Sequence, residues 1–212
     1  SIDKSTKKLS LLSIPRDTRV KIHGRGLDKI NSAYPYGGLN VTINTVEEFL
    51  GIEIDYYLLV NFQEFKNIVD TIGGIYIDID ENESAKISHL NGAKGLTKLN
   101  GDQTLAYARF RFDSQGDVGR VIRHQKIIKA IIDEFLKPNN LAKAPSVLNQ
   151  LNSNVHTNIP LLEITVLEKF FSGFNLDNSK TAIISGNWTT IDGIVYMIPN
   201  NQTKEQMITE LE

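Results

Sequence analysis

The chain of 212 residues contains no cysteine. This absence excludes a disulfide framework, thiolate metal sites and a cysteine nucleophile. The sequence also has no GxSxG elbow, no HExxH helix and no glycine-rich loop followed by a lysine. Those motifs are typical of α/β-hydrolases, zinc proteases and P-loop nucleotide-binding proteins. The chemistry of the protein must therefore come from other side chains, and its charged residues are the first candidates.

Charge of one sign is not in excess, because 23 lysines and arginines stand against 25 aspartates and glutamates, for a formal net charge of −2. Proteins that bind the phosphate backbone of nucleic acids usually carry a net basic face, so nucleic acid is not an expected partner. Prolines are few, with six in the chain, and 41% of the residues are hydrophobic. A chain of this length can bury a full core, and it shows no repeat or linker, so we predict one domain over residues 1–212.

Hydrophobic periodicity predicts alternating strands and helices. An apolar strand over Ile54–Val60, a helix capped by Asn61 and an alternating strand over Ile75–Ile79 form a β-α-β unit. This unit predicts the fold class α/β, as a layered α/β/α domain with a central mixed sheet flanked by helices. The other expected elements are strands over Lys8–Ile14, Thr181–Ser185 and Ile194–Ile198, helices over Thr42–Leu50, Val118–Lys137, Pro145–Leu151, Leu161–Phe174 and Gln202–Leu211, and a polar surface excursion over Ser84–Lys98.

Positive charge is concentrated between Tyr107 and Gln125, where the sequence reads YARFRFDSQGDVGRVIRHQ. Alternation from Ala108 to Phe112 predicts an extended segment with Arg109 and Arg111 on one side. Two parallel guanidinium groups match the oxygens of phosphate or carboxylate in bidentate geometry. We therefore predict an anion site here.

A helix is expected directly after this segment, with Asp117 as its N-cap. Arg120 and Arg123 would be neighbours in its first two turns, where cations oppose the helix dipole unless an anion lies between them. Gln125 falls within the apolar stripe of the helix, so it should be buried and hydrogen-bonded, facing a polar cavity floor or a ligand.

Two other interpretations of the cluster stay open. Asp113 and Asp117 could simply neutralise the arginines in structural salt bridges. His124 lies beside the arginines, whose charge would favour its neutral form, and a role as a catalytic base is one hypothesis for it. The local chemistry favours stabilisation of charge on a phosphoryl group, because such a transition state needs positioning and cations more than a protein nucleophile.

The strand Lys8–Ile14 is followed by the turn Pro15-Arg16-Asp17 at its carboxyl end, where open α/β sheets bind ligands. Arg16 is thus a candidate phosphate contact, and an ion pair with Asp17 is the alternative. A polar loop further along contains side chains that could line the same crevice or be merely structural, namely Lys29, Asn31 and Tyr34.

An acidic run consists of Asp78, Asp80, Glu81 and Glu83. It could suggest calcium or magnesium, but its spacing matches no cation-binding loop with a glycine turn. We therefore interpret it as a solvated strand end and loop.

Four ordered motifs resemble the LytR–CpsA–Psr family, the cell-wall glycopolymer ligases of Gram-positive bacteria. They are SIPRDT at Ser13–Thr18, DKINSAYPYGG at Asp28–Gly38, LNGDQTLAY at Leu99–Tyr107 and the arginine run that follows. The resemblance implies an enzyme, a phosphotransferase that passes an anionic glycopolymer of the wall teichoic acid or capsular polysaccharide type from a polyprenyl-pyrophosphate carrier to peptidoglycan through a phosphodiester.

The resemblance also implies roles for individual residues. Carboxylates and an arginine of the motifs are expected at the catalytic centre: Arg16, Asp17 and Asp117. Positions that match the family's pyrophosphate contacts are Arg16, Arg109, Arg111, Arg120, Arg123 and Gln125. A long apolar tunnel for the polyprenyl tail is expected beside the arginines, lined by the helices Phe62–Ile72, Val118–Leu136 and Leu161–Phe174.

Magnesium assists in that family, and its usual aspartate ligands lie upstream of the segment that matches Ser1. The chain begins at Ser1 without a methionine and shows no signal peptide or membrane span. We therefore interpret it as part of a membrane-anchored protein, lacking the anchor and first strands, with its soluble domain at the outer face of the plasma membrane. On this interpretation the metal ligands cannot be assigned, and the present chain should transfer polymer much more weakly than a longer one.

Two other functions stay open. The first is a lipid-pyrophosphate-binding or regulatory protein, similar to an attenuator, that performs no transfer. The second is a pyrophosphatase acting on the same lipid, which would differ from the ligase only in using water rather than a sugar hydroxyl as acceptor.

Overall fold

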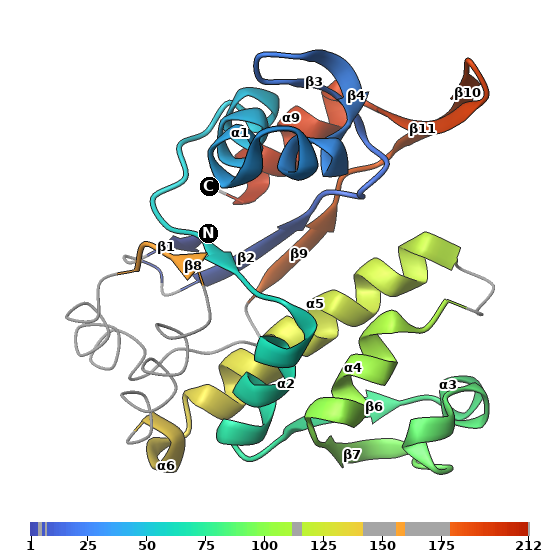
Figure 1. Cartoon of the computed structure of the whole chain (residues 1–212). Coiled ribbons are helices and arrows are strands. Elements are labelled where there is room, and N and C mark those ends of the chain that lie inside the picture. The colour runs from blue at the N-terminus through green and yellow to red at the C-terminus, as the bar shows by residue number, and fades with distance from the viewer. Residues whose placement is uncertain (4–5, 7, 112–115, 142–155, 160–178, 212) are drawn as a thin grey trace. The chain divides into compact units, whose positions relative to one another are not determined.

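The computed structural model describes residues 1–3, 6, 8–111, 116–141, 156–159 and 179–211. These residues form a mixed α/β structure (Figure 1) with two compact units. The first unit comprises Ser1–Asp3, Lys8–Asp55 and Asn178–Glu212, and the second comprises Lys4–Lys7 and Tyr56–Asp177. The predicted helices over Pro145–Leu151 and Leu161–Phe174 lie outside the described residues, and so does the predicted third wall of the tunnel.

The first unit contains a three-stranded mixed sheet in the order β1-β2-β9, in which β2 pairs antiparallel with β1 and parallel with β9. Two hairpins, β3-β4 and β10-β11, and two longer helices complete it. Its elements are β1 Ile2–Asp3, β2 Lys8–Ser13, β3 Arg19–Ile22, β4 Gly26–Lys29, η1 Ile30–Ser32, α1 Ala33–Leu50, β9 Lys180–Ile183, β10 Gly186–Ile191, β11 Ile194–Pro199 and α9 Asn201–Leu211.

The predicted strand at Lys8 ends at Ser13, and the turn at Arg16 and Asp17 follows it, as expected. The predicted helix before Gly51 is also present, and Gly51 closes it in the left-handed conformation with φ of 73°. Helix α1 is longer than predicted, however, because it begins at Ala33 and continues through a kink at Gly37 and Gly38. The β3-β4 hairpin was not predicted, so the segment before α1 is not the polar loop that we expected.

Among its described residues, the second unit contains two two-stranded sheets and the helices around them. Its elements are β5 Leu58–Leu59, α2 Phe62–Thr71, β6 Ile75–Ile79, α3 Glu81–Lys86, η2 Ser88–Leu90, β7 Gly95–Leu99, α4 Gly101–Arg109, α5 Gly116–Phe135, α6 Pro138–Leu141 and β8 His156–Thr157.

The hydrophobic core of the second unit forms where one face of β6 meets α2, α4 and α5. Strand β6 alternates buried and exposed residues along its length, as predicted. Its buried side chains pack with Val69, Ile72, Ile87, Leu90, Leu99, Tyr107, Ala108, Phe110 and Ile127. Helix α5 contributes Ile127 to this core, whereas Val118 and Ile128 of the predicted stripe are exposed.

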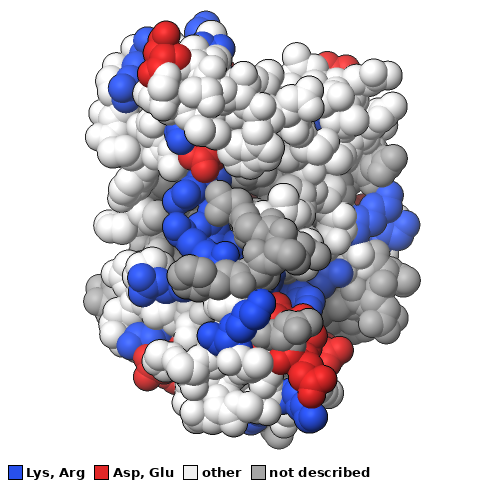
Figure 2. Space-filling model, turned by 90° about the vertical axis from the view of Figure 1, so that its right-hand side faces the viewer, with Lys and Arg blue, Asp and Glu red and all other residues white. Residues whose placement is uncertain are grey.

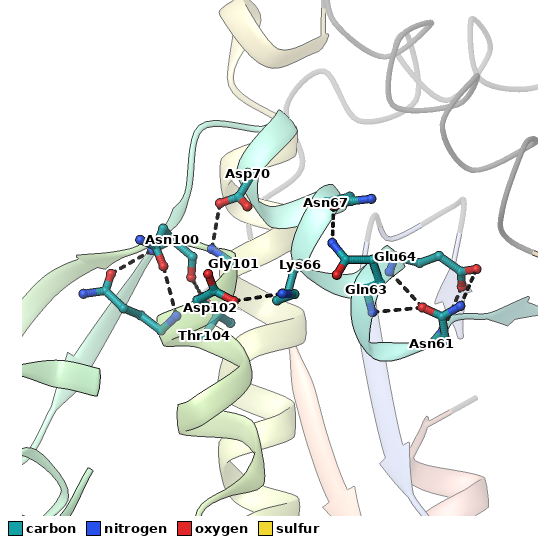
Figure 3. A network of polar contacts seen from close by, with 11 residues as sticks. Asn61, Gln63, Glu64, Lys66, Asn67, Asp70, Asn100, Gly101, Asp102 and Thr104 are labelled. Atoms are coloured by element: carbon teal, nitrogen blue, oxygen red, sulfur yellow. Dashed lines mark hydrogen bonds and ion pairs between the residues drawn. The ribbon is translucent and has the colours of Figure 1, made fainter. Parts of the chain in front are cut away.

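Polar contacts fix helix α2 against helix α4 (Figure 3). Asn61 caps α2 and Asn100 caps α4, each with a reciprocal capping box. The Gly101 amide donates to Asp70 Oδ1 at 2.7 Å, and Lys66 Nζ lies 2.9 Å from Asp102 Oδ1. These contacts hold the amino end of α4 to α2, and Arg109 is the last residue of that helix.

Two expectations for the second unit are wrong. Strand β5 pairs antiparallel with β8, and β6 pairs antiparallel with β7, so β5 and β6 do not share a sheet in a β-α-β unit. The segment Ser84–Lys98 is not a polar surface excursion, because it carries part of α3, η2 and most of β7 and buries Ile87 and Leu90. Among the described residues, no helix is both long and apolar enough to cross a membrane.

Candidate functional site

The candidate residues lie in two groups, one in each unit, and each group is described by itself. Lysine and arginine side chains reach the surface on the face drawn in Figure 2, with acidic side chains beside some of them. Arg16, Arg109 and Arg111 are exposed. They are thus accessible to an anionic ligand.

In the first unit, Asp17 joins two cations at the end of strand β2. Its carboxylate lies 2.7 Å from Lys29 Nζ through Oδ1 and 3.2 Å from Arg16 Nε through Oδ2. Burial alone would raise the pKa of Asp17, but the hydrogen bond and charge of Lys29, with Arg16 beside it, outweigh burial and hold the pKa below its ordinary value of 3.8. Asp17 is therefore ionised at neutral pH and orients both cations.

The other crevice candidates of the first unit do not lie in a loop. Lys29 ends β4, Asn31 lies in η1 and Tyr34 lies in the first turn of α1. The Asn31 amide donates to the Arg16 carbonyl at 3.3 Å, so the backbone of η1 holds the turn that carries Arg16. Asn31 and Tyr34 have exposed side chains. The structure thus brings Arg16, Asp17 and Lys29 together through side-chain contacts.

In the second unit, the predicted extended segment at Ala108 and Arg109 is wrong, because helix α4 continues to Arg109. Only from Phe110 is the backbone extended, with φ of −62° and ψ of 136°. The reason is the helical periodicity of the preceding residues, which buries Thr104, Tyr107 and Ala108 on one side of α4. Arg109 and Arg111 therefore do not alternate along one strand, although both are exposed.

The guanidinium of Arg109 lies over the ring of Phe62, 4.9 Å from its centroid. Phe62 is the first residue of α2 and is 60% exposed. A cation over an aromatic face is stabilised without losing its hydrogen-bonding edge. Arg109 thus combines an accessible cation with an accessible apolar ring, a pairing that suits a ligand with a charged head and an apolar tail.

Helix α5 begins at Gly116, so Asp117 lies inside its first turn rather than before it as the N-cap. Arg123 lies beyond the first two turns that were predicted to hold it, where repulsion from the helix N-terminus is weaker.

Arg123 is the least exposed of the candidate arginines, at 3%, and it contacts a backbone carbonyl and a buried carboxylate. One amine donates to the Phe110 carbonyl at 2.7 Å and another lies 3.4 Å from Glu83 Oε1. The Tyr107 hydroxyl lies 3.1 and 3.2 Å from the two carboxylate oxygens of Glu83. Burial chiefly, and the Glu83 carboxylate in addition, raise the pKa of Tyr107 well above its ordinary range. Arg123 therefore secures Phe110, the residue between Arg109 and Arg111.

Glu83 is the functional neighbour that the sequence did not reveal. It was interpreted as part of a solvated acidic run, but it is buried at 8% exposure and holds Tyr107 and Arg123. The available signal was the spacing of Asp80 and Glu83, which form a capping box at the start of α3.

Two further residues of α5 lie beside this network. Gln125 is buried at 8% exposure, as predicted. His124 Nε2 lies 3.0 Å from the Ala108 carbonyl, and this distance fits an Nε2–H donor. Burial lowers the pKa of His124 below its ordinary value of 6.5, and the charges of Arg120 and Arg123 lower it further against the opposing effect of that hydrogen bond. The neutral ring leaves Nδ1 with a free electron pair.

The described residues form no cluster of ligands for magnesium. In the part of the chain that the structure describes, no three histidine, aspartate or glutamate side chains lie together as a metal site would require. Asp17 is held by two cations and Glu83 by a tyrosine and an arginine. Asp17 and Glu83 are thus already engaged by protein groups in this structure.

The fold and these arginine-rich groups define an α/β protein with candidate contacts for a phosphate-bearing ligand. The model of the LytR_cpsA_psr family matches residues 1–212, and the chain therefore belongs to this family.

Curated relatives agree with this assignment. The chain is 38% identical over 213 residues to the polyisoprenyl-teichoic acid–peptidoglycan teichoic acid transferase TagV of Bacillus subtilis, covering 95% of this chain and 52% of that protein. It is 34% identical to the transferase TagU of Oceanobacillus iheyensis, covering 100% and 67%. The chain thus spans about half the length of the first relative and about two thirds of the second.

Solved structures of the family have the same fold. The crystal structure of B. subtilis TagV matches with a TM-score of 0.84 at 36% identity, covering 99% of this chain and 84% of that one. YwtF (TagT) with bound octaprenyl pyrophosphate lipid matches with a TM-score of 0.79 at 28% identity, covering 99% and 80%. TagT bound to LI-WTA matches with a TM-score of 0.84 at 29% identity, covering 99% and 80%.

Proposed function

We propose that this protein transfers an anionic glycopolymer, of the wall teichoic acid or capsular polysaccharide type, from a polyprenyl-pyrophosphate carrier to peptidoglycan. The observation that carries the proposal is its membership of the family over residues 1–212, together with arginines at the motif positions that are accessible in the structure. Relatives named as teichoic acid transferases and a solved relative with bound octaprenyl pyrophosphate support the same donor chemistry.

In the proposed reaction, an acceptor sugar hydroxyl attacks the phosphorus that carries the polymer. A new P–O bond forms to the sugar, the P–O bond to the carrier breaks, and the polyprenyl phosphate leaves with the electron pair. Negative charge grows on the leaving phosphate, so cations beside it lower the barrier. The acceptor proton passes to a base, for which Asp17, Asp117 and His124 are the candidates of this chain.

In the second unit, Arg109 and Arg111 are the proposed direct phosphate contacts, because both are exposed. Arg120 and Gln125 are proposed contacts on α5. Arg123 is proposed to act on the phosphate mainly by holding Phe110, since its guanidinium is buried and directed at Glu83 and the Phe110 carbonyl.

In the first unit, Arg16 and Lys29 are the proposed phosphate contacts and Asp17 orients them. An ionised Asp17 between two cations is a weak base, because its pKa lies below 3.8. We therefore assign Asp17 chiefly to positioning. Asn31 and Tyr34 are exposed and stay candidates for contacts with the sugars of the polymer.

Several family properties remain proposals for this protein. They are one α/β/α domain with a central mixed sheet, an apolar tunnel for the lipid tail, magnesium assistance with ligands upstream of Ser1, and a membrane anchor that holds the domain at the outer face of the plasma membrane. No step above is routed through magnesium.

The proposal is tested by incubating the protein with a lipid-linked teichoic acid and peptidoglycan, and then measuring polymer bound to the insoluble wall fraction. Transfer that falls in Arg109→Ala but not in Arg25→Ala supports the ligase, since Arg25 is an exposed arginine that lies outside the four motifs. Lipid binding without product favours the regulatory alternative. Release of polymer phosphate into water favours the pyrophosphatase.

A further inference from the structure

Arg19 and Lys29 lie directly opposite each other in the β3-β4 ladder of the first unit. Directly paired residues of an antiparallel ladder project from the same face, so the two cationic side chains are neighbours. Like charges in this arrangement repel and destabilise a hairpin. The pair therefore needs an opposing group.

The Tyr196 ring partly offsets the repulsion between Arg19 and Lys29. The Arg19 guanidinium lies 5.5 Å and Lys29 Nζ 5.7 Å from the centroid of the Tyr196 ring. The ring is buried and its position is fixed, because the neighbouring Met197 amide donates to the Asp17 carbonyl at 2.9 Å. One aromatic face offers only a modest attraction to a cation, so Tyr196 positions the two charges more than it neutralises them.

The nearby carboxylates do not neutralise Arg19. Asp17 is bound to Lys29 and Arg16. Asp28 accepts from the Lys29 backbone amide at 2.7 Å and lies 3.3 Å from Arg25. Arg19 Nε is a buried donor without a hydrogen-bond partner among the residues that the structure describes. A buried donor of this kind is costly unless a ligand or water satisfies it.

We propose that Arg19 and Lys29, held against Tyr196, bind a phosphate group of the substrate. The planar guanidinium of Arg19 would provide paired donors and Lys29 a point charge. The identity of the phosphate rests on the proposed function, because it could come from the pyrophosphate of the lipid carrier or from a phosphodiester of the polymer. Phosphate binding itself can be tested without any transfer.

The test uses calorimetric titration of the protein at low ionic strength with two probes, inorganic pyrophosphate and an oligomer of glycerol phosphate. Arg19→Gln should weaken binding of one probe by about tenfold, the scale of one lost charge-assisted hydrogen bond. The probe that is affected identifies the source of the phosphate. Arg25→Gln is the matched control from the same hairpin, and its affinity for both probes should stay within about twofold of the parent.

Equal affinity of Arg19→Gln and the parent for both probes would overturn the proposal and leave Arg19 with a packing role on Tyr196. Urea unfolding of each variant separates lost binding from lost folding. If Arg19→Gln does not fold, Arg19→Lys is measured instead. The lysine keeps the positive charge but lacks the paired donors of the guanidinium, so we expect about threefold weaker binding. Unchanged affinity of Arg19→Lys would overturn the proposal. A failed transfer reaction would count against the proposed function and leave these titrations valid.

Discussion

The Tyr107 hydroxyl lies within 3.2 Å of both carboxylate oxygens of Glu83, inside the second unit. The same carboxylate lies 3.4 Å from Arg123. Three elements, α3, α4 and α5, thus meet at one buried polar network. Because Arg123 also donates to the Phe110 carbonyl, the network fixes the backbone between Arg109 and Arg111.

Removing the cation from this network should strongly destabilise the protein. We expect Arg123→Leu to lower the free energy of unfolding by about 3–5 kcal/mol, because Glu83 would stay buried without its cation. Arg109→Ala should change it by less than about 0.5 kcal/mol, since Arg109 is exposed. Urea unfolding of both variants measures the difference. Equal small effects would show that Arg123 has no structural role.

Ligand binding, unlike stability, should depend strongly on the exposed Arg109. Arg109→Ala should weaken binding of a polyprenyl pyrophosphate by about 1.5–3 kcal/mol, the scale of a charge-assisted hydrogen bond. Arg109→Lys should rescue only part of this loss, because the planar fork over Phe62 is gone. Calorimetry with the lipid in detergent makes the measurement, with Arg25→Ala as control. Unchanged affinity in Arg109→Ala would remove it from the site.

The close packing of α4 on α2 at Gly101 predicts that a larger residue there destabilises the protein. A Cβ at this position would lie 2.5 Å from the Lys66 carbonyl oxygen and 2.8 Å from the Lys66 Cα, both backbone atoms. Gly101→Ala should therefore cost about 1–3 kcal/mol of stability by separating α2 from α4. Asp102→Ala, which removes only an exposed ion pair with Lys66, should cost less than about 1 kcal/mol. Thermal or urea unfolding that ranks the two in reverse order would contradict this packing.

The pKa of His124 predicts a pH dependence of stability. Folding holds this pKa below 6.5, so as the pH falls below about 6.5 the unfolded chain takes up the proton first and stability is lost. The loss continues until the folded ring also protonates. The free energy of unfolding should thus fall more between pH 7.5 and 5.5 in the parent than in His124→Gln, in which the other histidines are unchanged. Parallel pH profiles would contradict the assignment.

Local sequence signals predicted the local structure well. Asn61 predicted the start of α2, Gly51 the end of α1 and alternation the whole of β6. Each of these depends on residues a few positions apart, where capping and periodicity act.

The network of the second unit could not be predicted in this way. Glu83 lies 24 residues before Tyr107 and 40 before Arg123 in the chain, so its burial depends on tertiary contacts. The alternation at Ala108 and Arg109 misled for a similar reason, because packing of Tyr107 in the core extends the helix. The register that places Arg19 opposite Lys29 likewise depends on a hairpin that hydrophobic periodicity did not predict.

The proposed function requires that the arginines of this family member bind a polyprenyl pyrophosphate for transfer to peptidoglycan. The most direct test uses a donor with radiolabelled polymer, the parent protein and the Arg109→Ala/Arg111→Ala variant, whose exposed side chains should leave folding nearly unchanged. We predict that the parent moves label into the peptidoglycan fraction and that the variant does so at least about tenfold more slowly. Equal rates in the two proteins, in reactions with equal amounts of folded protein, would show that Arg109 and Arg111 have no part in transfer.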